Sequence, residues 1–205
     1  MPYDYTEAPP PRDTMELIPR DTIATLVLHI NTGGVGEDGM LTRSQDGGCE
    51  MLVAELTFVD GPYKGRKIFE RWILEGTTDG HEQAAKISRS TLRAILDSEL
   101  GLKPNDVSPQ ARAARTVSLK QFEGMTFTGK IGQEKGGPKK DKTTGEFTGE
   151  SWPDKNILAA VITPDKKDWK PVEQPPPFNG GGGGAAASGA PPSSAPPIAR
   201  PGWAS

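Results

Sequence analysis

The stretch from Glu50 to Leu74 constrains the fold most strongly, because apolar residues recur there at every second position on both sides of a turn signal. A period of two is typical of a strand with one buried face. The connector, residues 60–65, holds a proline between two glycines, which fix one backbone angle and give access to positive φ. The pattern predicts two strands, residues 50–59 and 66–74, in which the inward positions of the first are Leu52, Ala54, Leu56 and Phe58.

The second of these strands places Lys67, Phe69 and Arg71 on one face. A ring between two cations on a solvated sheet face suits a stacked base that is flanked by phosphates. The alternative is that Phe69 belongs to the core and that the two cations are ordinary solvated residues, since a single aromatic residue in a strand usually serves packing.

Three further strands and one helix follow from the same kind of pattern. We expect strands at residues 22–31, 125–131 and 155–163, and a helix at about 81–100 that begins after Thr78 or Asp79. Gly101 and Pro104 end this helix. Its predicted core stripe comprises Ala84, Ile87, Thr91, Leu92, Ile95 and Leu96. Residues 111–115 fit either a short helix or a loop that carries two cations.

The order of the elements is three strands, a helix and two strands. An all-β dominated fold with one helix between strands three and four is the order of the OB-fold, a small five-stranded barrel. In that fold the face of strands two and three and the loops after strands one and four bind nucleic acid. Those loops are residues 32–48 and 132–153 here, and the second is a long polar segment that carries Lys135, Lys139, Lys140 and Lys142.

Composition divides the chain into a domain and two tails. Residues 1–19 are acidic and proline-rich and predict an extended arm, while residues 20–170 form the OB-like domain. Residues 171–205 hold a proline triplet and a run of five glycines, which predict a disordered tail. Trp203 near its end is a candidate docking point for recombination or replication proteins.

Charge is distributed unevenly along a chain whose net charge is −3. Residues 1–39 carry seven acidic and two basic residues, whereas residues 130–142 carry five lysines and two acidic residues. Such an asymmetry allows nucleic-acid binding despite the low net charge. The single cysteine, Cys49, excludes an internal disulfide and a cysteine-built metal site. Without a membrane span or a secretory signal, the expected location is the cytoplasm.

The enzyme-like motifs of the sequence lack the structural context that their chemistry needs. The G-x-G-x-x-G match at residues 34–39 follows a strand but is not followed by a helix, so no helix N-terminus would hold a pyrophosphate. Residues 124–131 resemble a P-loop, yet Ile131 stands where a hydroxyl must bind Mg²⁺. His29 and His81, the only histidines, have no second ligand at metal spacing. We therefore expect no enzyme activity, cofactor or metal.

Two short motifs resemble a known family. Residues 61–67 open a strand, and residues 152–157 lead from a tryptophan and a proline into the last strand and then to Pro164 and Asp165. Together with the helix between them, they are similar to a family of small phage and prophage proteins that resemble OB-type single-stranded DNA-binding proteins. The resemblance covers residues 16–169 and implies a role in phage DNA replication or recombination. It also implies that Tyr63, Lys64, Arg66 and Lys67 lie at the binding hairpin, and Lys155 and Asn156 at the base of the basic loop.

The sequence thus predicts a non-catalytic, sequence-tolerant single-stranded DNA-binding protein, with a protein-interaction adaptor for a recombinase or polymerase as the alternative. Pairing of two copies stays open. The predicted nucleic-acid-binding residues are Tyr63, Lys64, Arg66, Lys67, Phe69, Arg71, Lys130, Lys135, Lys139, Lys140, Lys142, Phe147, Trp152 and Lys155. The lysines and arginines would neutralise phosphates, and the aromatic rings would stack on bases.

Overall fold

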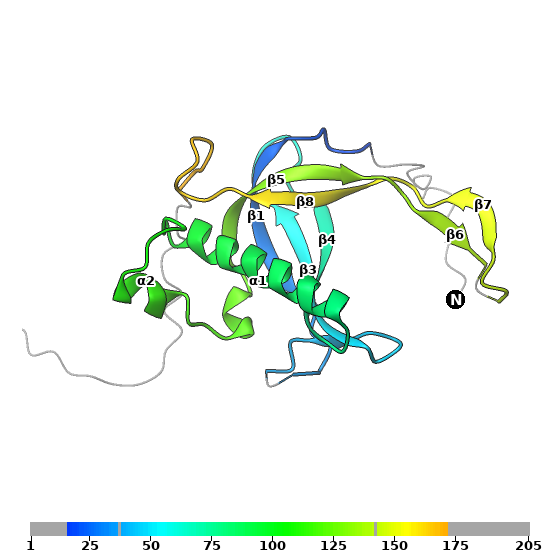
Figure 1. The fold of residues 1–205 in the computed structure, drawn as a ribbon. Coiled ribbons are helices and arrows are strands. Elements are labelled where there is room, and N and C mark those ends of the chain that lie inside the picture. Colours follow the sequence, from blue (N-terminus) through cyan, green and yellow to red (C-terminus); the bar gives the residue numbers. More distant parts are fainter. Residues whose placement is uncertain (1–15, 37, 142, 172–205) are drawn as a thin grey trace, which may run out of the picture. The chain divides into compact units, whose positions relative to one another are not determined.

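The fold is mostly β with one long helix, as the sequence predicted (Figure 1). The computed structural model describes residues 16–36, 38–141 and 143–171. The chain divides into two units, Met1–Glu173 and Gln174–Ser205, and all described residues belong to the first. The elements are β1 (Ile23–Ile30), β2 (Thr42–Arg43), β3 (Cys49–Phe58), β4 (Lys67–Gly76), α1 (Asp79–Glu99), α2 (Pro109–Ala114), the 3₁₀ turn η1 (Leu119–Phe122), β5 (Thr126–Glu134), β6 (Pro138–Lys140), β7 (Phe147–Ser151) and β8 (Lys155–Val161).

Six strands form one antiparallel sheet in which β3 and β1 are central. The order is β4-β3-β1-β5-β8, and the short β2 pairs with the start of β3 beside β1. The predicted hairpin forms the longest ladder, from Cys49 opposite Gly76 to Thr57 opposite Lys67. Gly61 and Gly65 in its connector have φ values of 72° and 79°, which confirms why glycine is needed there.

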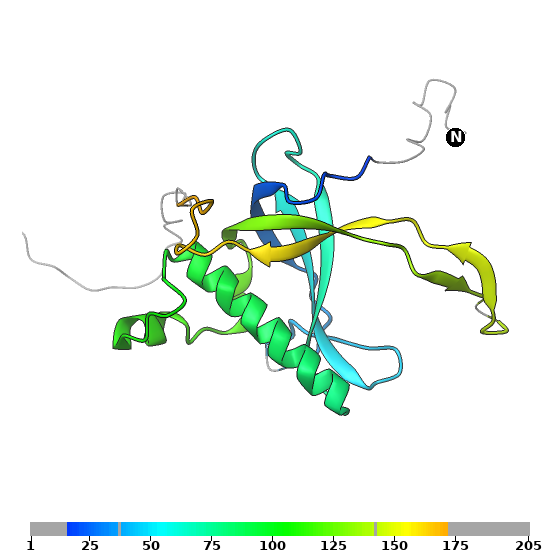
Figure 2. The same ribbon diagram turned by 45° about the horizontal axis from the view of Figure 1, so that its top comes forward.

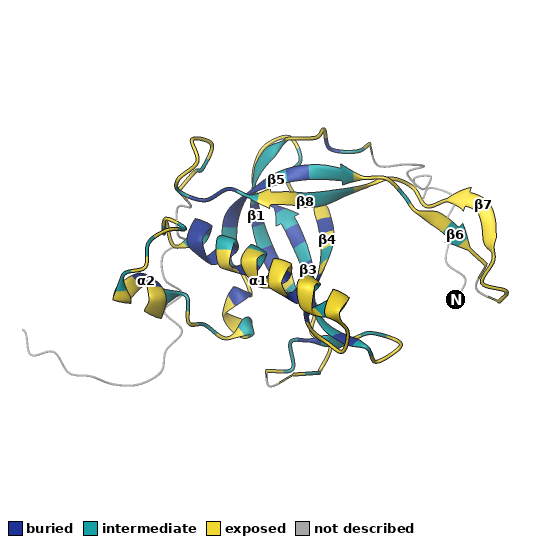
Figure 3. Ribbon diagram, in the orientation of Figure 1, coloured by how far each residue is buried: buried dark blue, intermediate teal, exposed yellow. Residues whose placement is uncertain are grey.

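The predicted inward positions make the core, which lies between the concave side of the sheet and α1 (Figure 3). Alternate residues of β3 are buried, from Leu52 to Phe58, and so are Leu26 and Leu28 of β1. Phe127 and Ile131 of β5 have no exposed surface. The period of two therefore predicted the buried faces of these strands correctly.

The helix begins where expected but buries a different stripe near its start. The hydroxyl of Thr78 caps it by accepting a hydrogen bond from the backbone N–H of His81. The prediction that Ile87 packs in the core is wrong, because 63% of Ile87 is exposed. Helical spacing back from Leu92 reaches Ser88 and Ala85 instead, and both are buried. Within the described ranges, no helix combines the length and apolar character needed to cross a bilayer.

The sheet does not close into the predicted barrel. No backbone ladder joins β4 to β8 among the described residues, although the two strands are neighbours. A side chain bridges this seam instead, since the Glu70 carboxylate accepts a hydrogen bond of 2.7 Å from the N–H of Leu158. Burial raises the pKa of the Glu70 carboxyl, and the bond from Leu158 opposes that shift.

The body of the fold begins earlier than the predicted boundary at residue 20. Ile18, placed by the prediction in the acidic arm, is buried in the core. Its N–H donates to the Asn156 side chain over 2.9 Å, and its carbonyl accepts from Asn156 and Gln133. The remainder of the predicted arm, residues 1–15, and nearly all of the predicted tail, residues 172–205, lie outside the described residues.

The long polar segment after β5 is more regular than the sequence suggested. β5 continues to Glu134, and β6 and β7 then pair as a separate two-stranded sheet. Figures 1 and 2 show this hairpin extending away from the six-stranded sheet. We call residues 135–154 the hairpin arm. The open question about residues 111–115 resolves largely as the short helix α2, which Ser108 caps.

Candidate nucleic-acid interface

The solvent side of β4 carries the predicted ring and cations, and we call Lys67, Phe69 and Arg71 together the Phe69 face. Ile68 and Trp72, at the intervening positions, are buried against the core. Because successive residues of a strand point to opposite sides, this burial turns the other set outward. Phe69 is 60% exposed, so the interpretation that it belongs to the core is wrong.

The cations of the Phe69 face differ in their partners. Glu55 lies directly across from Phe69 on β3, and its carboxylate is 2.8 Å from the Lys67 ammonium. A hydrogen bond from this ammonium lowers the pKa of the Glu55 carboxyl. Arg71 lies across from Val53 and has no acidic partner among the described residues. A phosphate at Lys67 would therefore compete with Glu55, whereas one at Arg71 would not.

The β3–β4 connector holds three predicted residues, of which two have structural contacts. The Tyr63 ring packs edge-on against Phe58, with ring centroids 6.2 Å apart. Arg66 lies 5.7 Å from the centre of the Tyr63 ring and donates a hydrogen bond of 2.7 Å to the carbonyl of Glu16. Tyr63 thus serves packing rather than offering an open ring. Lys64 is exposed at the turn.

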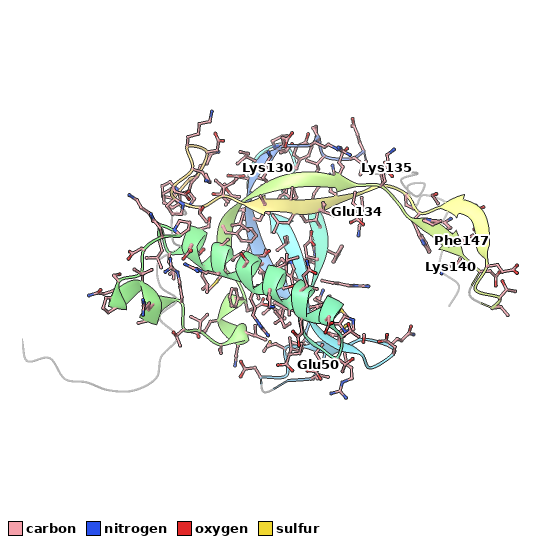
Figure 4. All side chains as sticks on the ribbon, viewed as in Figure 1. Glu50, Lys130, Glu134, Lys135, Lys140 and Phe147 are labelled. Atoms are coloured by element: carbon pink, nitrogen blue, oxygen red, sulfur yellow. The ribbon has the colours of Figure 1, made fainter. Side chains whose placement is uncertain are left out.

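Two more predicted cations, on β5 and β8, are paired with carboxylates. The Lys130 ammonium lies 2.7 Å from Asp21 and, by hydrogen bonding, lowers the pKa of that carboxyl. The Lys155 ammonium lies 3.2 Å from Glu134. Figure 4 shows Lys130, Glu134 and Lys135 in sequence along the strand that leads to the arm. Lys135 is exposed and has no acidic partner among the described residues.

The hairpin arm presents two rings and two lysines. Phe147 is 64% exposed and Trp152 is 59% exposed. The Lys140 ammonium lies 4.9 Å from the centre of the Phe147 ring, and that of Lys139 lies 5.2 Å from the centre of the Trp152 ring. Lys139 also forms an ion pair of 3.0 Å with Glu150. The last predicted lysine, Lys142, lies outside the described residues.

The predicted basic loop is not basic once the hairpin is complete. The window that ended at residue 142 left out residues 143–154, the returning half of the hairpin, which includes Glu146, Glu150 and Asp154. Residues 130–154 together hold five lysines and five acidic residues. In the structure, Lys130 and Lys139 are each neutralised by a carboxylate, those of Asp21 and Glu150. The arm's capacity to bind an anion therefore depends on individual lysines rather than on net charge.

The base of the arm contains residues whose roles sequence reasoning missed. A Cβ atom on Gly136 would lie 1.6 Å from the carbonyl oxygen of Trp152, so only glycine fits this crossing. The Asp154 carboxylate accepts a hydrogen bond of 2.9 Å from the Gly136 N–H. The sequence shows adjacent glycines at 136 and 137 but does not reveal that one of them allows two strands to cross.

A cavity of about 360 Å³ lies elsewhere, between α1 and residues 115–122. Leucines form much of its lining, and the nearby arginines are already bonded to protein groups: Arg89 to the Leu74 carbonyl, Arg93 to that of Pro104 and Arg115 to Asp97. None of the predicted residues lines it. Among the described residues, no group of three histidine, cysteine or acidic side chains is placed to hold a metal ion.

Two places therefore combine an exposed ring with a cation that lacks an acidic partner within the described ranges, namely Phe69 with Arg71 and Phe147 with Lys140.

Comparison of the chain with models of protein families, with curated proteins and with solved structures finds no significant match.

Proposed function

We propose that this protein binds single-stranded DNA without catalysis and with little sequence preference, through the Phe69 face and the hairpin arm. The observation that carries the proposal is Phe69, a large ring that is 60% exposed in mid-strand beside Arg71. Stacking on such a ring requires a base that is free of its own helical stack. That requirement favours an unpaired strand over duplex DNA, and every base offers a face to stack.

The strand order supports an OB-like arrangement, which we propose as the fold. In an OB-fold the first strand pairs with the second and the fourth, and the helix follows the third. The equivalent pairs here are β1 with β3 and β1 with β5, and α1 follows β4. The final pair of a closed barrel would be β4 with β8, where Glu70 and Leu158 make the one contact described above. The Phe69 face then corresponds to the face of strands two and three.

The proposed setting is phage DNA replication or recombination in a host cytoplasm, as the resemblance implies. Contacts to recombination or replication proteins through the C-terminal tail are part of the proposal, as is pairing of two copies. The adaptor alternative differs in one measurable property, because a pure adaptor needs no exposed ring that accepts a base.

A labelled oligonucleotide titration tests the proposal. Fluorescence anisotropy would be followed with oligo-dT, a duplex of equal length and oligo-U, each at two salt concentrations. We expect tight binding of oligo-dT, weaker binding of duplex, and loss of affinity with salt at a slope of about −0.7 per neutralised phosphate. No binding to any of the three would contradict the proposal and favour the adaptor role.

A further inference from the structure

The hairpin arm has two chemically different faces. Its register pairs Lys140 with Phe147 and Pro138 with Ser151, with an irregularity in the ladder between the two pairs. Lys139 lies between Pro138 and Lys140 and points to the other side. The contacts agree, because Lys139 reaches Glu150 and Trp152 while Lys140 reaches Phe147.

The Lys140–Phe147 face is open. Phe147 is 64% exposed, and Lys140 is exposed above its ring. No described carboxylate lies within ion-pair distance of the Lys140 ammonium. In Figure 4 the two side chains lie together on the arm. An exposed ring with a cation close to it offers a stacking surface to a base and a charge to the phosphate that adjoins it.

The Lys139–Trp152 face is occupied by contacts within the protein. The Lys139 ammonium forms an ion pair of 3.0 Å with Glu150 and lies 5.2 Å from the centre of the Trp152 ring, which is 59% exposed. The backbone of Trp152 is held as well, since its N–H donates a hydrogen bond of 2.8 Å to the Gly137 carbonyl. Its own carbonyl oxygen occupies the space that a Cβ on Gly136 would need. Trp152 is thus part of the crossing that sets the direction of the arm.

We infer that the arm binds nucleic acid with one face only. Phe147 stacks on one base and Lys140 contacts the neighbouring phosphate, whereas the backbone of Trp152 positions the arm and Lys139 contacts Glu150 and the Trp152 ring instead of the ligand. This inference rests on the proposed function and divides the two predicted rings into a binding residue and a positioning residue. It also excludes Lys139 from the set of phosphate contacts.

Oligo-dT affinity and tryptophan fluorescence of the full chain test the inference together. Phe147→Ala should weaken binding by about 5-fold or more, the effect of losing one stacked base. Trp152→Phe should change neither the affinity nor the fluorescence quenching that oligo-dT causes. In the Trp152→Phe background, Phe147→Trp should keep the affinity and add a quenching signal on titration, because the new indole would lie under a base.

Charge provides the second measurement. Lys140→Gln should flatten the salt dependence of oligo-dT binding by about 0.7 in slope, and Lys139→Gln should leave it unchanged. The inference is overturned if Phe147→Ala binds as tightly as wild type, if Trp152→Phe abolishes quenching, or if Lys139→Gln flattens the slope as much as Lys140→Gln. Failure of the wild-type chain to bind oligo-dT would instead overturn the proposed function, and this inference with it.

Discussion

The Phe69 face and the hairpin arm present the same pair of groups, an exposed ring beside a cation, but the protein holds them in different ways. On β4, Ile68 and Trp72 are buried in the core, so packing dictates which side Phe69 takes. On the arm every residue of β7 is exposed, and no core lies beneath it. There, cross-strand pairing and the glycine crossing at Gly136 set the side-chain directions.

An exposed ring beside a cation is therefore held rigidly where a core packs behind it, and can be separated from the body of the fold where none does. The Phe69 face cannot be displaced without unfolding the sheet, whereas the arm can lose its geometry while the body stays folded. We therefore expect substitutions at the Phe69 face and in the hairpin arm to differ in how they affect DNA affinity and the stability of the fold.

The largest effect is expected for Phe69→Ala. Loss of one stacked base should weaken oligo-dT binding about 5- to 150-fold, which corresponds to about 1–3 kcal/mol. The free energy of unfolding should change by less than about 0.5 kcal/mol, because the side chain is mainly exposed. Ile87→Ala is the matched control, since Ile87 is 63% exposed on α1. Equal affinities of the two variants would remove Phe69 from the interface.

Substitutions at two neighbouring glycines test whether DNA binding by the arm depends on the crossing where the arm begins. Gly136→Ala would place a methyl group 1.6 Å from the Trp152 carbonyl oxygen, whereas no atom lies within 4 Å of a Cβ on Gly137. We expect Gly136→Ala to weaken oligo-dT binding about as much as Phe147→Ala, roughly 5-fold, with the thermal unfolding midpoint of the body retained. Gly137→Ala should bind as wild type. A lower unfolding midpoint for Gly136→Ala would show that the arm and the body are not separable.

A smaller effect of opposite sign is expected for Glu55→Gln. Removing this carboxylate frees Lys67, so affinity for oligo-dT should rise about 1.4- to 5-fold and the salt slope should steepen by about 0.7. Glu50→Gln is a close control, because the Glu50 side chain is 19% exposed, against 18% for Glu55, and also pairs with a cation, Arg43. Figure 4 shows Glu50 by β2 and β3, far from the arm. A similar gain from both variants would indicate a general charge effect rather than release of Lys67.

The smallest effect on binding, but a distinct one on stability, is expected at the β4–β8 seam. Because burial raises the pKa of Glu70 in the folded state, this carboxyl keeps its proton to a higher pH in the folded protein than in the unfolded chain. Glu70 therefore lowers stability as pH rises through the raised pKa. In urea unfolding, the stability of Glu70→Gln relative to wild type should grow over that window and then level off, with oligo-dT affinity unchanged.

Glu99→Gln provides a comparison for the seam, since burial also raises the pKa of Glu99, whose carboxylate accepts a hydrogen bond from the Thr126 N–H. It should show the same sign of pH dependence. A stability difference between Glu70→Gln and wild type that shrinks with rising pH would contradict the assignment of Glu70 as a buried carboxylate.

The sequence predicted the parts of the fold that a core enforces. Alternation in β3 identified its buried face, and the set Lys67, Phe69 and Arg71 was correctly grouped on one side of β4. What the pattern could not decide was which side of β4 is solvated, because that depends on Trp72 and on the strand's neighbours. Periodicity failed at Ile87, where a serine and an alanine lie closer to the sheet than the isoleucine does.

The charges of the candidate site were the least predictable part. Lys130 pairs with Asp21 from a distant segment, and Lys67 pairs with Glu55 only because of the β3–β4 register. Neither ion pair can be predicted from the residues that are adjacent in the sequence. The strands of the arm were not predicted because both faces of the hairpin are polar or exposed. Apolar residues therefore do not alternate with polar ones along these strands.

Photo-crosslinking tests the central claim most directly, because it reports which residues touch an unpaired strand. The full chain would be irradiated with an oligonucleotide that carries 5-bromodeoxyuridine, digested, and analysed by mass spectrometry. We predict crosslinked peptides that contain Phe69 and Phe147, and loss of the first in Phe69→Ala. Crosslinks confined to α1 or to the residues around the Leu92 and Leu96 cavity would contradict the account.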